Sequence, residues 1–597
     1  MPVGPLLVAA AFCAMFVWTA GGWPDPQIDF GRELYVPWQL ARGQVLHRDI
    51  AVIYGPLSQY FNALWFALFG PGLWVLVAVN AALFAALLAL LYGLVRRVAD
   101  RPAATLACLL AVALFGFGQY VPAGNYNFLT PYCHEATHGL LLALAGLACL
   151  AAFLARGDAR WAGAAGLAVG AAFLTKLEPF VAAFAATSLG IALGLWSERA
   201  PAGRGLRTAL AYAAGLLLPP ALAWALLQAA LSPGDALRGV LGSWAHLGNP
   251  ELVALPFFRS GIGSDALGRN LARIALGLAW CAALAVPPLG LALGLRGAGR
   301  RARLAACALV FGAVAGVLLA LDWREFWIHA GRPLPVLAAG ALAGALARLR
   351  GVRDQPDARA RSVLRVALAA LAFAMLLRML LNARLHHYGF VLALPATALV
   401  TAMAVSSIPA WIRRRGGAPA VFQAAALAVA LAAAAAHLQQ TGLWIARKTV
   451  AVGAGRDRFV AEDRGRVLTE ALEQIRKAAP PEATLVVLPE GVMLNYLARR
   501  RNPTPYVSFL PPELIIFGEE RVVASLREAR PDLVVLLQRD TGEYGVGGFG
   551  SGYGGAIREW LTGSYHQAAP LIGKPGPGNA DWALIFERNA RAAPPRL

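Results

Sequence analysis

The sequence predicts an all-α, multi-spanning membrane protein that ends in a small α/β domain. Of its 597 residues, 58% are hydrophobic and only 14% are charged, a composition that soluble globular domains do not have. Up to about residue 438, apolar runs long enough to cross about 30 Å of hydrocarbon recur along the chain. Beyond that point, shorter apolar stretches alternate with charged and turn residues, which favours strands and amphipathic helices.

Thirteen apolar runs qualify as membrane-spanning helices. The first has no basic stretch ahead of it, so we interpret it as a retained helix and not as a cleaved signal peptide. The runs lie at about residues 4–21, 72–95, 102–118, 136–155, 161–175, 180–196, 208–230, 270–295, 302–321, 334–347, 363–382, 389–411 and 418–437. A transmembrane domain is therefore expected over residues 1–438, with a long first loop at 22–70, and a second domain over 439–597.

Charge is distributed unevenly between alternate connectors. Every second connector is short and rich in arginine, whereas acids and histidines gather in the others. Because arginine marks the cytoplasmic side, we expect a cytoplasmic amino terminus and a carboxyl-terminal domain on the periplasmic or extracellular side of the cytoplasmic (inner) membrane. The same bias explains the net charge of +20, so we expect membrane lipids as surroundings and no nucleic-acid partner.

The carboxyl-terminal segment alternates predicted strands and helices. Strands are expected at 484–488, 532–537 and 582–586, and helices at about 467–478, after the turn at Pro489 to Gly491, and at 519–527. The glycine-rich run from Gly542 to Gly555 resembles a phosphate-binding loop. Nucleotides are scarce outside the cytoplasm, so we expect instead a loop that shapes the access of an acceptor.

The first loop is the most informative segment, because it is long, charged and rich in aromatic and turn residues. Asp29 and Glu33 are four residues apart, which places both carboxylates on one face if the segment is helical. Between Pro56 and Gly70, apolar residues recur at helical spacing and predict an amphipathic helix at the membrane interface. Such a loop frames a cavity at the membrane surface.

The first loop also carries a set of motifs, namely Asp29, GRELY at Gly31 to Tyr35, LxRG at Leu40 to Gly43, HRDI at His47 to Ile50, and YGPL at Tyr54 to Leu57. With these motifs, its dozen or so spans and its outer carboxyl-terminal domain, the chain resembles the bacterial membrane glycosyltransferases of the GT-C fold, the class of protein mannosyltransferases and aminoarabinose transferases. The resemblance implies transfer of a sugar from a polyprenyl-phosphate-linked donor to a glycan, lipid or protein acceptor. It implies no cofactor and no metal ligand, with a divalent metal left open.

The resemblance further assigns roles to residues. Family members use an acid of the first loop as catalytic base or acceptor anchor, and Asp29 matches that position. Glu33 is the second expected catalytic acid, although many relatives have adjacent Asp and Glu where Phe30 follows Asp29 here. The reaction needs a base near the acceptor and cations near the departing lipid phosphate. The residues expected to bind substrate are Asp49, Tyr54, Glu135, His138, Lys176, Glu178, Arg324, Arg384 and His387.

Two other functions compete with transfer. A transporter or flippase for an anionic lipid-linked substrate would use the same charges, but transporters place broken helices or repeated halves at the midplane. The segment Pro131 to Gly139 contains the HExxH pattern of zinc proteases, with His134 and His138 on either side of Glu135. It lacks an evident third ligand, so we expect Glu135 and a histidine to line the outer cavity.

Overall fold

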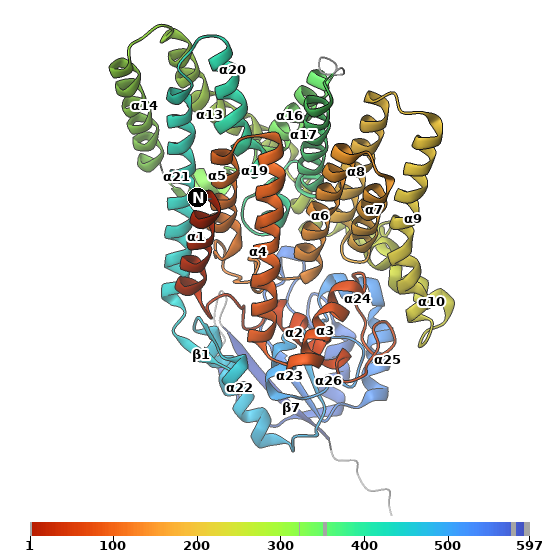
Figure 1. Cartoon of the computed structure of the whole chain (residues 1–597). Coiled ribbons are helices and arrows are strands. Elements are labelled where there is room, and N and C mark those ends of the chain that lie inside the picture. Colours follow the sequence, from red (N-terminus) through yellow and green to blue (C-terminus); the bar gives the residue numbers. More distant parts are fainter. Residues whose placement is uncertain (1–2, 322, 350–354, 575–580, 590–597) are drawn as a thin grey trace, which may run out of the picture.

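The computed structural model describes residues 3–321, 323–349, 355–574 and 581–589, and shows a bundle of long helices standing on an α/β layer (Figure 1). Each of the thirteen predicted apolar runs is helical. Within the described ranges, nine helices are long and apolar enough to cross a membrane, and three shorter apolar helices accompany them. The apolar helices are α1 (Val3–Thr19), α4 (Leu73–Val98), α5 (Arg101–Leu110), α6 (His134–Arg156), α7 (Ala159–Phe173), α8 (Leu177–Ser197), α9 (Ala202–Leu227), α13 (Leu267–Gly294), α14 (Arg300–Ala320), α16 (Leu334–Leu349), α17 (Pro356–Met375), α18 (Gly389–Leu392), α19 (Leu394–Ala402), α20 (Ile408–Arg414) and α21 (Pro419–Arg447).

Two of the apolar segments contain a π-helical turn. The turn η1 (Ala111–Gly116) continues α5, and η4 (Met403–Ser407) joins α19 to α20. A π turn widens the helix by one residue and leaves a carbonyl without its regular partner. At η4 the side chain of Gln423 in α21 supplies a partner, because its Nε2 donates to the carbonyl of Val405 at 2.9 Å.

The arginine-rich connectors lie together at one end of the bundle. In Figure 1 the turns between α4 and α5, between α13 and α14 and between α20 and α21 all point away from the α/β layer. The loops that carry most of the acids lie at the other end, against that layer. The sided distribution of charge is thus a property of the folded chain, and its orientation toward the cytoplasm stays a prediction.

Short helices form the surface between the bundle and the α/β layer. The predicted amphipathic helix of the first loop is confirmed as α3 (Leu57–Phe69), and α2 (Phe30–Leu40) precedes it. The other short elements on this level are α10 (Pro233–Leu241), η2 (Gly242–His246), α11 (Pro250–Ala254), α12 (Pro256–Ile262) and η3 (Leu377–Met379), whereas α15 (Trp323–His329) packs against α21 in the bundle.

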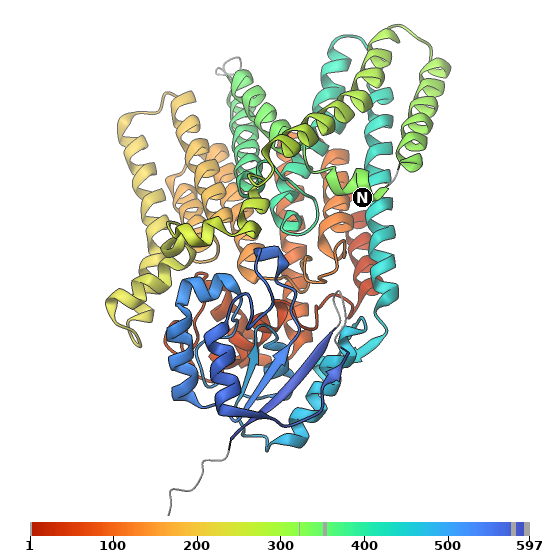
Figure 2. The same cartoon turned by 180° about the vertical axis from the view of Figure 1, so that it is seen from behind.

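The carboxyl-terminal segment folds around a small mixed sheet, as the sequence predicts. The strands β3 (Leu485–Leu488) and β4 (Leu533–Leu537) are parallel, β7 (Trp582–Arg588) pairs antiparallel with β4, and β5 (Tyr565–Gln567) and β6 (Ile572–Gly573) pair with β7. A separate hairpin joins β1 (Val450–Val452) to β2 (Phe459–Ala461). The helices are α22 (Arg464–Ala478), α23 (Met493–Ala498), α24 (Pro511–Phe517), α25 (Glu519–Ala529) and α26 (Gly555–Ser564), with the short turns η5 (Gly455–Asp457) and η6 (Gly542–Tyr544). Figure 2 shows the sheet below the bundle from the other side.

The first loop packs tightly against this sheet domain. A Cβ on Gly31 would lie 2.4 Å from the amide nitrogen of Met493, so α2 approaches α23 at a distance that only glycine permits. The buried carboxylate of Asp25 forms a 2.9 Å ion pair with Arg464 of α22. Segments more than four hundred residues apart in the sequence therefore form one continuous layer under the bundle.

Candidate active site

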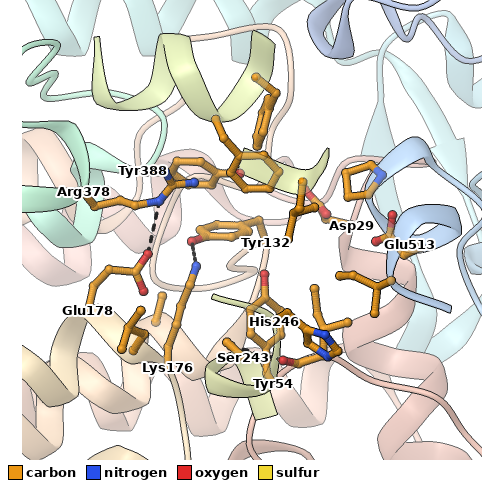
Figure 3. Close-up of a pocket in the computed structure, with 18 of the residues that line it drawn as sticks. Asp29, Tyr54, Tyr132, Lys176, Glu178, Ser243, His246, Arg378, Tyr388 and Glu513 are labelled. Atoms are coloured by element: carbon orange, nitrogen blue, oxygen red, sulfur yellow. Dashed lines mark hydrogen bonds and ion pairs between the residues drawn. The ribbon is translucent and has the colours of Figure 1, made fainter. Parts of the chain in front are cut away.

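A cavity of about 690 Å³ lies between the helical bundle and the α/β layer. Its wall combines the first loop, the starts of α6 and α8, the segment from η2 to α12, the end of α17 and loops of the sheet domain (Figure 3). The polar residues of the wall are Gln27, Asp29, Arg32, Tyr54, Tyr132, Lys176, Glu178, Ser243, His246, Arg259, Ser264, Arg378, Tyr388, Glu490, Ser508, Glu513 and Tyr544.

Much of the cavity wall is apolar. Helices α8, α11 and α12, the turn η3 and the segment around α18 contribute Leu177, Val181, Leu252, Val253, Phe257, Phe258, Ile262, Leu377, Val391 and Leu392. An apolar wall that also carries charged side chains matches a ligand that has both an apolar chain and a charged head.

Asp29 occupies a strained turn at the polar end. Its φ of 57° and ψ of −59° place it outside the helical region, and the amide of Phe30 donates to the carbonyl of Ile28 at 2.6 Å. This is a γ-turn with a positive φ, a rare conformation for a residue other than glycine. Strain of this kind concentrates at functional sites.

The turn separates Asp29 from Glu33, contrary to the expectation that a helix places them on one face. Because α2 begins at Phe30, Asp29 lies outside the helix and its side chain faces the cavity. Among the described residues, its carboxylate receives one side-chain hydrogen bond, of 3.4 Å, from Asn125 Nδ2. The carboxylate is thus largely free to bind a ligand.

The surroundings of Asp29 make it a better proton acceptor than an ordinary aspartate. Burial raises the pKa of Asp29 to about 8, and the nearby carboxylate of Glu490 adds to the rise, while Arg32 and Arg539 oppose it. A carboxylate with such a raised pKa binds a proton more tightly than an exposed carboxylate does.

Glu33 lies behind the cavity wall in a closed network. Its Oε2 accepts hydrogen bonds from the amide of His134 at 3.0 Å and from Nδ1 of the same histidine at 2.6 Å, and its Oε1 accepts from Arg32 Nε at 3.1 Å. Burial opposes the charge of Glu33, but the bonds from His134 and the charge of Arg32 lower its pKa to about 2. Glu33 therefore positions Arg32, which lines the cavity.

The HExxH segment takes part in the same buried network. His134 bonds Glu33 and lies 3.0 Å from Asn80 Nδ2, and His138 Nδ1 lies 3.0 Å from the hydroxyl of Ser58. No group of three potential ligands in the described ranges is placed to hold a metal ion. These partners give the zinc-protease alternative no support.

Glu135 and His138 do not line the main cavity. Glu135 accepts a 2.9 Å hydrogen bond from Gln59 and faces a pocket of about 20 Å³ beside the cavity, which Arg32, Tyr54 and Glu513 share. Of the residues expected to line the outer cavity, Glu135 thus lines only this small side pocket, and His138 lines neither of the two.

Lys176 is held in a cage of tyrosines. Its Nζ donates to the hydroxyl of Tyr132 at 2.6 Å and lies 5.2 Å, 4.8 Å and 5.5 Å from the ring centroids of Tyr54, Tyr132 and Tyr388. Within the described part of the chain, no carboxylate forms an ion pair with it. Burial opposes its charge, but the surrounding hydroxyl and thiol groups raise its pKa well above the usual value. A half-buried ammonium group without a paired acid is suited to an anionic ligand.

The YGPL motif explains how Tyr54 reaches this cage. The amide of Gly55 donates to the carbonyl of Thr175 at 3.2 Å, and the amide of Leu57 donates to the carbonyl of Leu174 at 3.1 Å. A Cβ on Gly55 would lie 2.3 Å from that same carbonyl oxygen of Leu174. Glycine thus lets the start of α3 lie against the end of α7, next to Lys176.

A second cation lies farther along the cavity. Arg378 forms a 3.5 Å ion pair with Glu178, and its guanidinium lies 5.2 Å from the ring centroid of Phe258. Figure 3 shows both pairs, Lys176 with Tyr132 and Arg378 with Glu178, on the same side of the cavity, whereas Asp29 and Glu513 lie across it.

Three of the other predicted binding residues lie elsewhere. Asp49 pairs with Arg48 at 2.8 Å near the surface. Arg384 Nε donates to Asn382 at 3.2 Å, and His387 Nε2 lies 2.7 Å from the Tyr126 hydroxyl, both outside the cavity wall. The side chain of Arg324 lies outside the described residues. Their roles in binding stay predictions.

The sheet domain contributes acids that sequence reasoning did not select. Glu490 follows β3 and Arg539 follows β4, and Arg539 Nε donates to Glu490 Oε2 at 2.7 Å. Because β3 and β4 are parallel, their carboxyl ends lie at the same edge, where α/β domains bind ligands. The turn Pro489 to Gly491 directly after a predicted strand was the available signal. Glu513, whose pKa burial raises to about 7, also lines the cavity.

A second, polar pocket of about 540 Å³ adjoins the first loop on its other side. Gln27 lines both cavities, and its Nε2 donates to the carbonyl of Gln538 at 2.7 Å. The remaining wall of this pocket is Ile28, Pro122, Ala123, Arg447, Thr449, Glu462, Asp463, Arg464, Gln538, Arg539, Asp540 and Asp581.

Comparisons with known proteins agree with this architecture. Residues 54–224 match the family described as dolichyl-phosphate-mannose-protein mannosyltransferase. No curated protein sequence matches the chain. The structure is similar to the oligosaccharyltransferase of Archaeoglobus fulgidus tethered with an acceptor peptide, with 16% identity, a TM-score of 0.50 and coverage of 95% of this chain and 72% of that one. ArnT from Cupriavidus metallidurans, bound to undecaprenyl phosphate, gives 16% identity, a TM-score of 0.45 and 97% coverage of both chains. The fold predicted from the sequence is confirmed.

Proposed function

Because the chain is an integral membrane protein with the GT-C fold of glycosyltransferases, we propose that it transfers a sugar from a polyprenyl-phosphate-linked donor to an acceptor at the outer face of the cytoplasmic membrane. One observation carries the proposal. Asp29, a carboxylate in a strained turn, and Lys176, a half-buried ammonium group that has no carboxylate partner among the described residues, line the same cavity, whose wall is rich in apolar side chains.

The apolar part of the wall suits the donor. A polyprenyl chain would lie along the side chains of α8, α12 and α17, and its phosphate would meet Lys176 and Arg378. The hydroxyl of Tyr132, which accepts a hydrogen bond from Lys176, retains its own proton to donate to a phosphate oxygen. These groups stabilise the phosphate as it leaves.

Asp29 would act as the general base. The acceptor oxygen or nitrogen attacks the anomeric carbon of the sugar, its proton passes to the Asp29 carboxylate, and the bond between the anomeric carbon and the phosphate oxygen breaks with its electron pair going to the lipid phosphate. The charge of Arg32 attracts the Asp29 carboxylate, and Glu490 accepts a hydrogen bond from the backbone amide of Asp29.

The polar pocket on the other side of Gln27 suits the acceptor. Its wall mixes arginines with acids, which matches a hydrophilic group better than a lipid tail. In this arrangement the donor approaches from the membrane and the acceptor from water, on the two sides of Gln27.

The proposal is tested by incubating the purified full chain with labelled polyprenyl-phosphate sugars and membrane extracts, and following donor loss and product mass. Asp29→Asn is expected to fold and to lose transfer, whereas Asp235→Asn, at an exposed site in α10 that is not part of the cavity wall, is expected to retain it. Transfer by Asp29→Asn at the unmodified rate would contradict the assignment.

The flippase alternative predicts a different result. A flippase moves the lipid-linked sugar between leaflets without loss of the sugar, so the donor would stay intact while its sidedness in proteoliposomes changes. Donor cleavage that depends on Asp29 is expected only of the transferase.

A further inference from the structure

A second charged cavity lies at the opposite end of the bundle from Asp29. It measures about 610 Å³ and is formed where α4, α5, η4, α20 and α21 meet the start of α17. Figure 1 places the connector between α4 and α5 and the start of α17 at the end of the bundle away from the α/β layer. This cavity plays no part in the proposed transfer.

Five arginines surround this arginine pocket, which we define by Arg96, Arg97, Arg361, Arg365 and Arg413. They come from three separate helices, α4, α17 and α20, and so converge only in the folded chain. In the part of the chain that the structure describes, none of the five forms an ion pair with a carboxylate. The one acid of the wall, Asp100, is engaged as the cap of α5, because it accepts the amide of Ala103 at 3.0 Å.

The innermost arginine is fixed by the fold. Arg365 Nε and Nη2 both donate to the carbonyl of Val98, the last residue of α4, at 3.0 Å and 2.6 Å. Arg361 lies one turn earlier on α17, on the same face. Arg365 therefore acts as a rigid base of the pocket. Among the residues that the structure describes, no side chain accepts a hydrogen bond from the other four guanidinium groups.

The π turn η4 forms part of the same wall. Val405 and Ser406 of this turn line the pocket, and Gln423 both lines it and bonds the Val405 carbonyl. π turns occur preferentially at functional sites, because the widened helix re-aims its side chains. Here Ser406 of the widened turn lines the pocket together with the arginines.

From this convergence we propose that the arginine pocket is a binding site for a phosphate-bearing ligand, the headgroup of an anionic phospholipid with two phosphates. Five like charges near one another repel, and an anion relieves that repulsion. Arginine binds phosphate oxygens through paired N–H donors. The volume falls in the range of sites that enclose a small ligand, and basic pockets between transmembrane helices at one membrane face suit phospholipid headgroups.

A simple bias of arginines toward one membrane side would not produce this arrangement. Such a bias acts on connectors as a whole, so it predicts the same lipid dependence for any exposed pair of arginines at that end. Arg300 and Arg301 at the start of α14 are such a pair, exposed and outside the pocket.

The test uses the purified full chain in detergent. Tetraoleoyl cardiolipin and dioleoyl phosphatidylethanolamine are titrated separately, and bound lipid is followed by native mass spectrometry and by the thermal midpoint of unfolding. We expect cardiolipin to bind and to raise the midpoint, and phosphatidylethanolamine to do neither. The double variant Arg97→Gln with Arg413→Gln, whose side chains are exposed, is expected to weaken cardiolipin binding by about tenfold or more, since one charge-assisted hydrogen bond contributes roughly a factor of ten.

The matched control is Arg300→Gln with Arg301→Gln, which removes the same charge from the same end. Equal loss of binding in both double variants, or no binding in the unmodified chain, would overturn the proposal. A third arm uses sodium pyrophosphate without lipid. If pyrophosphate binds as tightly as cardiolipin and its binding is weaker in the pocket variant, the arginine pocket is a phosphate site whose ligand is a soluble anion. If cardiolipin alone binds, the ligand is the lipid.

Discussion

The backbone amide of Asp29 donates a hydrogen bond of 3.0 Å to Oε1 of Glu490, across 461 residues of sequence. This bond joins the first loop to the carboxyl end of β3 and places two acids side by side in one cavity. The same contact holds the strained turn at Asp29 and brings a second negative charge near its carboxylate. Glu490 therefore contributes both to the backbone conformation of Asp29 and to its raised pKa.

The first prediction concerns the pH dependence of transfer. A general base acts in its deprotonated form, and burial together with Glu490 raises the pKa of Asp29 to about 8. We expect kcat/KM to rise with pH and to level off above about pH 8. A profile that is flat between pH 6 and pH 9 would argue against Asp29 as the base.

Glu490→Gln provides the sharper form of this test. The variant keeps an oxygen that accepts the amide of Asp29 but removes the charge that raises its pKa. The rising limb of the pH profile should move to lower pH. Asp540→Asn, which removes a nearby charge outside the main cavity, is the control and should leave the midpoint of that limb in place.

The second prediction is that Asp29→Asn stabilises the fold. The folded-state pKa of Asp29 is about 8 and its ordinary value is 3.8, so between these values the folded state binds more protons than the unfolded state. Stability is then lost as pH rises from about 4 to about 8, and asparagine removes this loss. We expect the variant to exceed the unmodified chain by about 3 °C in thermal midpoint at pH 8, and by less at pH 5.

Other groups that titrate in the same range, such as Glu513, are common to both proteins and cancel in this difference. A difference that is equal at the two pH values would show that the charge of Asp29 does not strain the fold.

The third prediction separates the two acids that the sequence places together. Glu33 accepts four hydrogen bonds in a buried network. Glu33→Gln places an amide N–H where the network supplies only donors, and is expected to cost about 3 kcal/mol of stability. Its thermal midpoint should fall, in contrast to that of Asp29→Asn. Glu473→Gln, on the exposed face of α22, is the control for the substitution itself.

Sequence reasoning located the thirteen apolar helices and most of the sheet domain because hydrophobic length and periodicity are local properties. It also selected Asp29, Tyr54, Lys176 and Glu178, which the fold brings to one cavity. It did not select Glu490 or Glu513, because their position depends on how the sheet domain docks beneath the first loop. It placed Asp29 and Glu33 on one helix face, since a γ-turn leaves no periodic signal in the sequence.

The fourth prediction concerns the tyrosine cage. Lys176→Met keeps the length of the side chain but removes the charge that the proposed phosphate would meet, and loss of roughly 3 kcal/mol would lower kcat/KM by about 100-fold. The acceptor substrate should bind as before. The same substitution at Lys477, exposed on α22, is the control. Tyr132→Phe removes the hydroxyl that accepts the 2.6 Å bond from Lys176 and should give a smaller loss.

The fifth prediction concerns how closely α3 approaches the end of α7. In Gly55→Ala the new methyl group would lie 2.3 Å from the carbonyl oxygen of Leu174, a backbone atom that cannot rotate away. We expect Tyr54 to move from Lys176, with about 1–3 kcal/mol of lost stability and lower transfer activity. Gly93→Ala in α4 meets no atom within 4 Å and should leave both measurements unchanged. If Gly55→Ala also retained both, the close approach of Gly55 to Leu174 would not be what positions Tyr54 beside Lys176.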